Sequence, residues 1–254
     1  MVDPRTFYGD LAGDYHLMFR DWWASAQHQG DVLGELLRRH GIHPPARVAD
    51  CTCGIGTQAL PLAAQGFRVA GSDLSAAAVA RARTEARDRG IELALSVADV
   101  RALPPADRPF DAVVSCDNSL PHLLTDADLA AALRSIRGLL DPGGLFLAST
   151  RDYDAIVRDQ VAGVMPAVHD VDGRRRIVGQ AWQWSADHRT VEIHVFCLRR
   201  EGPEWAAAVR STTYRALLRD ELTAALSTAG FADVRWLFPD ESGYYQPVVV
   251  AQAR

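Results

Sequence analysis

Hydrophobic and polar positions follow a recurring order through the middle of the chain, in which short apolar runs alternate with longer stretches of helical spacing. The apolar runs predict strands at residues 46–51, 67–73, 91–99, 110–117 and 144–150. Helical spacing is found near residues 58–65, 76–90 and 126–140. Strands separated by helices form βαβ units, so this order predicts a doubly wound, mostly parallel α/β sheet that binds ligands at the carboxyl ends of its strands.

The two ends of the chain have other patterns. Residues 5–40 show no strand pattern and predict two helices that cover the sheet. The stretches RRRIVGQAWQWS and TVEIHVFCLRR alternate like antiparallel strands and predict a hairpin above the site. Residues 211–230 predict a helix, and FADVRWLF with YYQPVVVAQA predicts a final antiparallel pair that completes a seven-stranded sheet of the Rossmann-like type.

These patterns predict three parts of the chain. An N-terminal helical cover takes residues 1–45, and the cofactor-binding core takes residues 46–160 and 212–254. Residues 161–211 form an antiparallel lid inserted over the acceptor site. The DPGG sequence at 141–144 predicts a turn before the fifth strand.

The composition limits the possible partners. The chain has 254 residues, 48% hydrophobic and 23% charged, with a net charge of -5. That balance is typical of a globular protein and argues against nucleic acid or an anionic membrane as a partner. No apolar run approaches the ~20 residues of a membrane span, and the first residues do not resemble a secretory signal. We therefore expect a cytoplasmic protein with a small-molecule partner, as a monomer or a homo-oligomer.

Two features of composition exclude particular chemistry. All 27 basic residues are Arg, which excludes Schiff-base catalysis by Lys and a Walker-type phosphate loop. The four cysteines, Cys51, Cys53, Cys116 and Cys197, form no CxxC pair and no zinc spacing with histidine. We predict no metal site and expect Cys51 and Cys53 to be packed at a strand end.

The loop DCTCGIGTQ, residues 50–58, follows the first predicted strand. Its continuation GIGTQA fits the G-x-G-x-x-[GA] dinucleotide pattern, and a helix start behind glycines favours an anion such as pyrophosphate. Asp50, however, lies four residues before Gly54, where a carboxylate repels pyrophosphate and attracts a cation. S-adenosylmethionine has no phosphate and carries an ammonium and a sulfonium. The loop favours that cofactor, with an NAD-dependent oxidoreductase as the more distant alternative.

Two further acids end the next two predicted strands. Asp73 closes the second strand, where a carboxylate can accept both hydrogens of a ribose diol. Asp99 closes the third strand, where an adenine amino group would lie. Aspartate is also common in turns and caps, so each has a structural alternative. Three acids at consecutive strand ends favour the cofactor interpretation.

In this order of elements the sequence resembles the class I S-adenosylmethionine-dependent methyltransferases, with Ile55 where their D-x-x-C-G-T-G loop has Thr. The resemblance implies S-adenosyl-L-methionine as cofactor and S-adenosyl-L-homocysteine as product. It also implies a cofactor site made of Tyr8, Tyr15, Asp50, Cys53, Gly54, Gly56, Thr57, Gln58, Asp73, Leu74, Asp99, Val100 and Asp117.

CDNSLPHLL and STRDYD resemble segments that line the acceptor pocket in glycine/sarcosine-type small-molecule N-methyltransferases. Carried over, Asn118 and Arg151 would hold a substrate carboxylate, and Tyr153 would support the arginine. The planar guanidinium suits this role because it binds a carboxylate through two hydrogen bonds. The structural alternative is that Arg151 pairs with Asp152 or Asp154.

Further residues of the resemblance are His122, which forms the pocket floor or relays a proton, and Tyr214 and Arg215, which can touch the acceptor. Tyr8 and Tyr15 belong to a helical cover in which aromatic rings can face the sulfonium, although helix packing is their commoner role. We name Asn118, Arg151 and His122 as the catalytic candidates.

The reaction implied is direct in-line displacement at the methyl carbon by a neutral amine. Positioning and exclusion of water carry most of such a reaction, so no strong acid–base group is required. Trp182 and Trp184 in the predicted lid would suit a flat acceptor. A C- or O-methyltransferase of an aromatic or heterocyclic natural-product intermediate is therefore the alternative.

Overall fold

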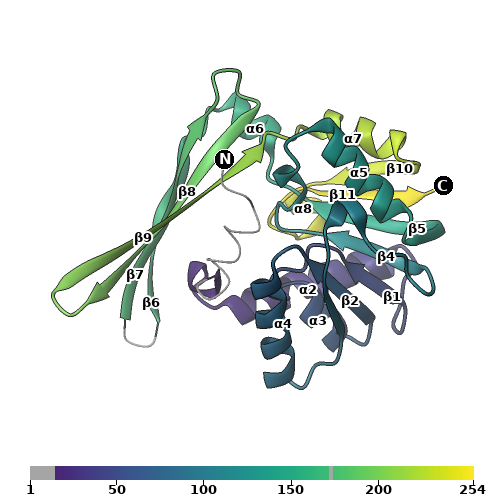
Figure 1. Cartoon of the computed structure of the whole chain (residues 1–254), viewed down its shortest axis with the longest axis horizontal. Helices are drawn as coiled ribbons and strands as arrows, with labels where there is room; N and C mark the ends of the chain where they lie inside the picture. Colours follow the sequence, from purple (N-terminus) through teal and green to yellow (C-terminus); the bar gives the residue numbers. More distant parts are fainter. Residues whose placement is uncertain (1–14, 172–173) are drawn as a thin grey trace.

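The computed structural model describes residues 15–171 and 174–254. Tyr8, one of the predicted cofactor contacts, lies outside these residues. The described residues form an α/β core and a second, antiparallel sheet that projects from one side of it (Figure 1). We call this second sheet the lid sheet.

The core sheet has seven strands in the spatial order β10-β11-β5-β4-β1-β2-β3. β11 runs antiparallel to both β5 and β10, whereas the pairs from β5 through β4, β1 and β2 to β3 are parallel. This order confirms the predicted seven-stranded, mostly parallel sheet. The strands are β1 (Arg47–Asp50), β2 (Arg68–Asp73), β3 (Ala94–Val97), β4 (Phe110–Ser115), β5 (Leu140–Ser149), β10 (Phe231–Leu237) and β11 (Val248–Ala253).

Helices cover both faces of this sheet. The longer ones are α2 (Trp22–Arg39), α4 (Ala76–Asp88), α5 (Asp126–Arg137) and α7 (Arg219–Thr228). Short ones are η1 (Tyr15–Met18), α3 (Ala59–Ala64), η2 (Val100–Ala102), η3 (Leu120–His122), α6 (Tyr153–Arg158) and α8 (Pro239–Ser242). Leu133 of α5 and Leu226 of α7 pack with Phe146 on one face. Leu33 of α2 and Leu62 of α3 pack on the other face.

The helix starts follow from local sequence. The side chain of Ser75 accepts a hydrogen bond from the backbone of Ala78, as its predicted N-cap position requires. Thr125 caps α5 in the same way, and Asp21 caps α2. These caps fix α4 and α5 directly behind the loops that follow β2 and β4, where the site lies.

The predicted hairpin is in fact a four-stranded sheet, in the order β6-β7-β8-β9. Its strands are β6 (Gly163–Val171), β7 (Arg174–Trp184), β8 (Thr190–Glu201) and β9 (Glu204–Arg215). The two stretches that we predicted as strands are β7 and β8. The outer strands escaped prediction because Pro166 and an irregular register interrupt β6, and because the first half of β9 contains three successive alanines.

The predicted helix at 211–230 is shorter than expected, since α7 begins only at Arg219. Residues 211–215 instead belong to β9, which pairs with β8 without interruption from Glu204 to Arg215. This long ladder overrides the local helical spacing, and the predicted lid boundary at 211 falls within β9. The DPGG turn is likewise part of β5, which starts at Leu140 and has an irregular register beside β4.

Within the described residues, no helix combines the length and apolar character that a membrane crossing requires.

Candidate functional site

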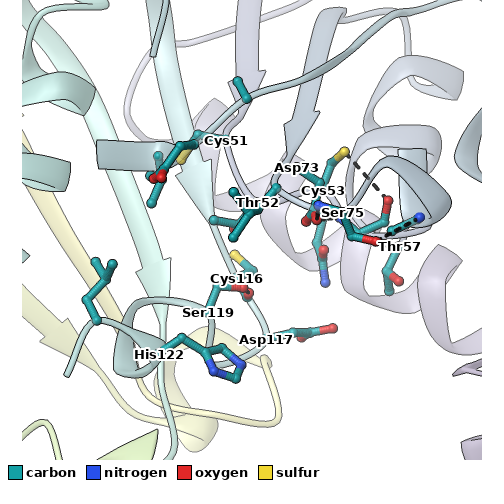
Figure 2. A pocket seen from close by; sticks show the side chains of 18 of the residues that line it. Cys51, Thr52, Cys53, Thr57, Asp73, Ser75, Cys116, Asp117, Ser119 and His122 are labelled. Carbon is teal, nitrogen blue, oxygen red and sulfur yellow. Dashed lines mark hydrogen bonds between the residues drawn. The ribbon is translucent and has the colours of Figure 1, made fainter. Parts of the chain in front are cut away.

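The carboxyl ends of the central strands surround a cavity of about 480 Å³, which we call the cofactor cavity. The loop after β1 lies on one side of it, and the segment after β4, with Asp117, Ser119 and His122, lies on the other (Figure 2). Of the predicted cofactor residues, those that line it are Tyr15, Cys53, Gly54, Thr57, Gln58, Asp73, Leu74, Asp99, Val100 and Asp117.

The glycine loop needs glycine at both positions. Gly54 and Gly56 have φ angles of 52° and 96°, in the left-handed region that side chains disfavour. A Cβ on Gly56 would lie 2.8 Å from the side chain of Leu60, so Gly56 allows the loop to pack on α3. A Cβ on Gly54 would meet nothing within 4 Å. The backbone at Gly54 therefore borders open space that a ligand can enter.

Asp73 connects the two loops at this edge. One carboxylate oxygen accepts a hydrogen bond from the Gly54 amide at 2.9 Å, and the other accepts one from the Ser75 amide at 2.9 Å. Burial raises the pKa of Asp73, although both amide bonds oppose that shift. Each oxygen keeps a further lone pair, so the carboxylate can still accept a hydrogen bond from a ligand.

Asp50 is placed differently from the prediction. Its side chain is buried behind the loop and does not line the cavity. One oxygen accepts a hydrogen bond from Thr52 at 3.2 Å. Burial raises its pKa to about 8, and the charges of Asp73 and Asp117 add to the shift. Asp50 therefore stays mostly protonated at pH 7 and does not contact a ligand in the cavity directly.

The predicted acid Asp99 also lines the cofactor cavity. Its carboxylate holds Arg101 at 2.7 Å, and Arg101 also reaches Asp128 at 2.8 Å. Among the described residues that line this cavity, Arg101 is the one arginine, and both its partners are carboxylates. Arg101 and Asp128 were not predicted from the sequence. The proximity of Arg101 to Asp99 in the sequence was the available signal.

A second cavity of about 680 Å³ lies between the core and the lid sheet, and we call it the acceptor cavity. Tyr15 and Asp117 line both cavities, so they form a shared wall. One oxygen of Asp117 accepts hydrogen bonds from the hydroxyls of Tyr244 at 2.8 Å and Tyr245 at 2.7 Å. Burial nevertheless raises the pKa of Asp117. The two tyrosines were not predicted, although they stand together in the segment YYQP.

Asp117 and Asn118 have positive φ angles of 58° and 66°. This conformation is uncommon outside glycine but is tolerated best by Asp and Asn. The amide of Asp117 donates to the side chain of Ser149, and the amide of Asn118 donates to the backbone carbonyl of the same residue. The carboxyl ends of β4 and β5 thus hold this turn in a fixed position beside both cavities.

A buried polar network supports the wall from behind. The Gln58 amide donates to the Gln29 side chain at 2.7 Å, and the Tyr244 hydroxyl lies 2.6 Å from the same oxygen. Trp22 donates to the Thr57 hydroxyl at 3.2 Å. Helix α2 is therefore tied to the glycine loop by hydrogen bonds as well as by packing.

Arg151 lines the acceptor cavity, and its side chain makes contacts that the sequence did not reveal. One terminal nitrogen donates to Gln180 at 3.1 Å, and the guanidinium lies 4.9 Å from the centre of the Trp182 ring. The other terminal nitrogen, Nη1, is buried and has no hydrogen-bond partner among the described residues. The alternative pairing with Asp152 or Asp154 is absent there.

Those two aspartates are occupied by Arg219, which pairs with both. Asn118 accepts a hydrogen bond from the Arg151 amide at 3.1 Å and donates to the Tyr153 hydroxyl at 3.0 Å. Tyr153 is buried, lines neither cavity and supports Asn118 rather than the guanidinium.

The remaining predicted acceptor residues separate into two groups. Tyr214 lines the acceptor cavity, and its ring lies 4.1 Å from that of His122. Burial lowers the pKa of His122 to about 3, and the charge of Arg151 adds to the shift, so the imidazole is neutral at pH 7. Arg215 lines neither cavity and pairs with Asp126 at 2.6 Å. Its side chain holds β9 to α5.

The buried cysteines are part of the wall of the cofactor cavity. Cys51, Cys53 and Cys116 line it as free thiols, and burial raises the pKa of each. They are therefore protonated at pH 7 and act as small apolar groups. The described residues contain no group of three or more His, Cys, Asp or Glu side chains placed to hold a metal ion.

This sheet order, with a glycine loop after β1 and an acid at the end of β2, is the arrangement of the class I S-adenosylmethionine-dependent methyltransferases. Residues 48–144 match the family described as "Methyltransferase domain". This part of the chain is therefore a methyltransferase domain, and it is similar to proteins that use S-adenosyl-L-methionine as cofactor.

Relatives of known sequence and structure agree. A glycine/sarcosine N-methyltransferase of Parasynechococcus marenigrum (strain WH8102) is 35% identical over 138 residues, which cover 54% of this chain and 48% of that protein. The chain thus spans about half the length of the curated relatives that it matches first.

Two solved structures share the fold over nearly the whole chain. The CcbJ methyltransferase from Streptomyces caelestis has a TM-score of 0.79 at 19% identity and covers 99% of both chains. CalS10, an amino pentose methyltransferase from Micromonospora echinaspora that is involved in calicheamicin biosynthesis, has a TM-score of 0.75 at 20% identity, covering 95% of both chains. At these identities the likeness concerns the fold alone.

Proposed function

We propose that this chain transfers a methyl group from S-adenosylmethionine to a nitrogen of a small molecule that also carries an anionic group, by direct in-line displacement. The observation that carries the proposal is the buried Nη1 of Arg151, which has no partner among the described residues and belongs to a side chain that lines the acceptor cavity. A buried guanidinium nitrogen that makes no hydrogen bond destabilises the protein, unless a bound ligand accepts that hydrogen bond.

The residues of the cofactor cavity fit this cofactor. The open space at Gly54 admits a ligand against the backbone, and Asp73 retains capacity to accept hydrogen bonds from a ribose diol. Asp73 and Asp117 line this cavity with carboxyl groups, which suit a ligand with an ammonium and a sulfonium and disfavour pyrophosphate. When bound, S-adenosylmethionine supplies an activated methyl group on a cationic sulfur.

The acceptor cavity has a polarity that suits an amine with an acid group. Arg151 provides a site for the anionic end, and Asp117 provides a carboxylate at the wall next to the cofactor cavity. An amine held between them would have its nitrogen directed at the shared wall. Placing the nitrogen there and excluding water beneath the lid sheet supply the acceleration. Neutral His122 has no imidazolium proton to donate at pH 7.

Two tryptophans of the predicted lid were the observation that favoured a flat, aromatic acceptor. Neither Trp182 nor Trp184 lines the acceptor cavity. Trp182 donates to Gln180 and lies against Arg151, whereas Trp184 donates to the backbone of Val161. These rings support the lid sheet and the guanidinium. The similarity to a glycine/sarcosine N-methyltransferase adds support for transfer to nitrogen.

The test has a binding step and a turnover step. Calorimetric titration with S-adenosylhomocysteine, with NAD in parallel, should show binding of the former only. Transfer of labelled methyl should then be measured with glycine and sarcosine, with ethylamine as an amine without an acid and propionate as an acid without an amine. Transfer to glycine or sarcosine alone supports the proposal. Transfer to ethylamine with equal efficiency would refute the role of the anionic group, and binding of NAD would refute the proposal entirely.

A further inference from the structure

The lid sheet has two edge strands, β6 and β9, and they differ in how they are protected. Protein sheets usually protect an edge, because its unpaired N–H and C=O groups can pair with another chain. β6 contains Pro166 and has an irregular register between Val164 and Ala167. Both features hinder pairing with a further strand. The outer edge of β6 is therefore protected.

β9 has none of this protection. It is regular over twelve residues and contains no proline. Its first half, EWAAAVR, is apolar between its two charged ends, and Trp205 and Val209 are 45% and 62% exposed. The β8–β9 turn lies at the end of the lid sheet that is remote from the core (Figure 1). A long, flat, apolar edge in this position is a template for another strand.

The face of the lid sheet directed away from the acceptor cavity is also apolar beside this edge. The register places Phe196 of β8 opposite Val209, and Leu198 opposite Ala207. These residues alternate with Val195, which lines the acceptor cavity, so they lie on the opposite face. Val168 on β6 is 58% exposed on the same outer face. A second copy that extended the sheet at β9 would continue this face.

We infer that two copies of this chain associate through β9, antiparallel and about a two-fold axis that passes between the two Ala207 residues. In an antiparallel pair, two directly opposite residues lie on the same face of the joined sheet. For two identical strands related by a two-fold axis, the axis must therefore pass between one residue and its own copy in the partner subunit. This condition leaves only a few registers to compare.

The register centred on Ala207 is the one that matches both charge and shape. It places Glu204 opposite Arg210 of the partner subunit, and Trp205 opposite Val209 of the partner subunit. These are an opposite-charge pair and an aromatic–aliphatic pair, the two kinds that stabilise antiparallel sheets. Each pair occurs twice because of the symmetry.

Neighbouring registers lose this match. Moving the axis to Ala208 places Trp205 opposite Ser211 and Glu204 opposite Thr212. Moving it to Arg210 places the two arginines against each other. The Ala207 register uses only residues 204–210, so each core stays beyond the opposite end of the joined strands.

Charge reversal tests the register directly. Glu204→Arg alone or Arg210→Glu alone would create like-charge pairs and should raise the dimer dissociation constant about tenfold, the scale of two repulsive cross-strand pairs. An equal mixture of the two variants should restore the dimer, because every pair then joins opposite charges. Arg68→Glu, on the exposed surface of β2, is the control for a change of net charge. Sedimentation velocity over a range of concentrations gives the dissociation constants.

Cysteine cross-linking provides a second test of the same axis. Ala207→Cys should form a disulfide-linked dimer under mild oxidation, since it would lie opposite its own copy. Thr213→Cys, on the same strand outside the paired segment, should not. The wild-type chain controls for its own four cysteines. A monomeric wild type, a dimer unaffected by both charge reversals, or equal cross-linking at 207 and 213 would overturn the inference. None of these readouts depends on the proposed methyl transfer.

Discussion

The cofactor cavity and the acceptor cavity share a wall, but the first is lined largely by backbone and the second by side chains. The cofactor cavity is made mainly by loops that directly follow strands, and much of its surface is backbone held by Gly54 and Asp73. The acceptor cavity is made by side chains from η1, α6, the lid sheet and the segment before β11. A backbone site tolerates sequence change, whereas a side-chain site can change specificity with few substitutions. The comparison suggests a fixed cofactor and an adaptable acceptor.

Substitution of Arg151 should give the largest difference between the effect on acceptor binding and the effect on cofactor binding. Arg151→Gln removes the charge that we assign to the acceptor's anionic group, and should raise the Michaelis constant for that acceptor about 100-fold. Affinity for S-adenosylhomocysteine should stay within twofold in calorimetry. Arg158→Gln, an exposed arginine that pairs with Asp159, is the matched control. Equal loss of cofactor affinity would mean that the two cavities are not independent.

Substitution of Asp73 should have the opposite result, in which cofactor binding is weakened and acceptor binding is not. Asp73→Ala removes the proposed ribose acceptor and the partner of the Gly54 amide, and should weaken S-adenosylhomocysteine binding by roughly 1–3 kcal/mol. The acceptor's Michaelis constant at saturating cofactor should be little changed. Asp88→Ala on the exposed side of α4 serves as the control. Unchanged cofactor affinity would remove Asp73 from the site.

Asp50 should make the free energy of unfolding of the ligand-free protein depend on pH. Its pKa is raised from 3.8 to about 8 by burial, so the folded state keeps a proton that the unfolded state releases between these values. The contribution of Asp50 to stability is therefore present at low pH and is lost as pH rises toward 8, by about 1.4 kcal/mol per pH unit. Asp50→Asn should remove this slope in urea unfolding between pH 5 and 8. An identical slope in both proteins would show that Asp50 is ionised when folded.

A substitution next to the shared wall should have only a small effect on turnover. Tyr245→Phe removes one of the two hydroxyls that donate to Asp117 and should lower turnover several-fold, as expected for loss of about 1 kcal/mol. Because the hydroxyl lowers the pKa of Asp117, its loss should also shift the acidic limb of the pH–rate profile upward. Turnover that is unchanged at all pH values would assign Asp117 a purely structural role.

The sequence predicted one cavity better than the other for a physical reason. The glycine loop and the acids after β2 and β3 lie at strand ends that local apolar patterns locate, so their convergence followed from the parallel sheet. Asp50 does not line the cavity, which the pattern could not show, because it gives the strand end but not the direction of the side chain. Arg151 was predicted through a resemblance, and only the tertiary structure showed that Arg219 takes its two neighbouring acids.

The sequence by itself determined the core sheet, the cofactor loop and the class of cofactor, because these depend on hydrophobic periodicity and on short motifs whose spacing is local. The tertiary structure alone decided the four-stranded lid and the wall formed by Asp117 with Tyr244 and Tyr245. It also decided that Nη1 of Arg151 has no hydrogen-bond partner within the described part of the chain. Each of these depends on residues distant in the chain, whose pairing is set by register and packing rather than by neighbouring sequence.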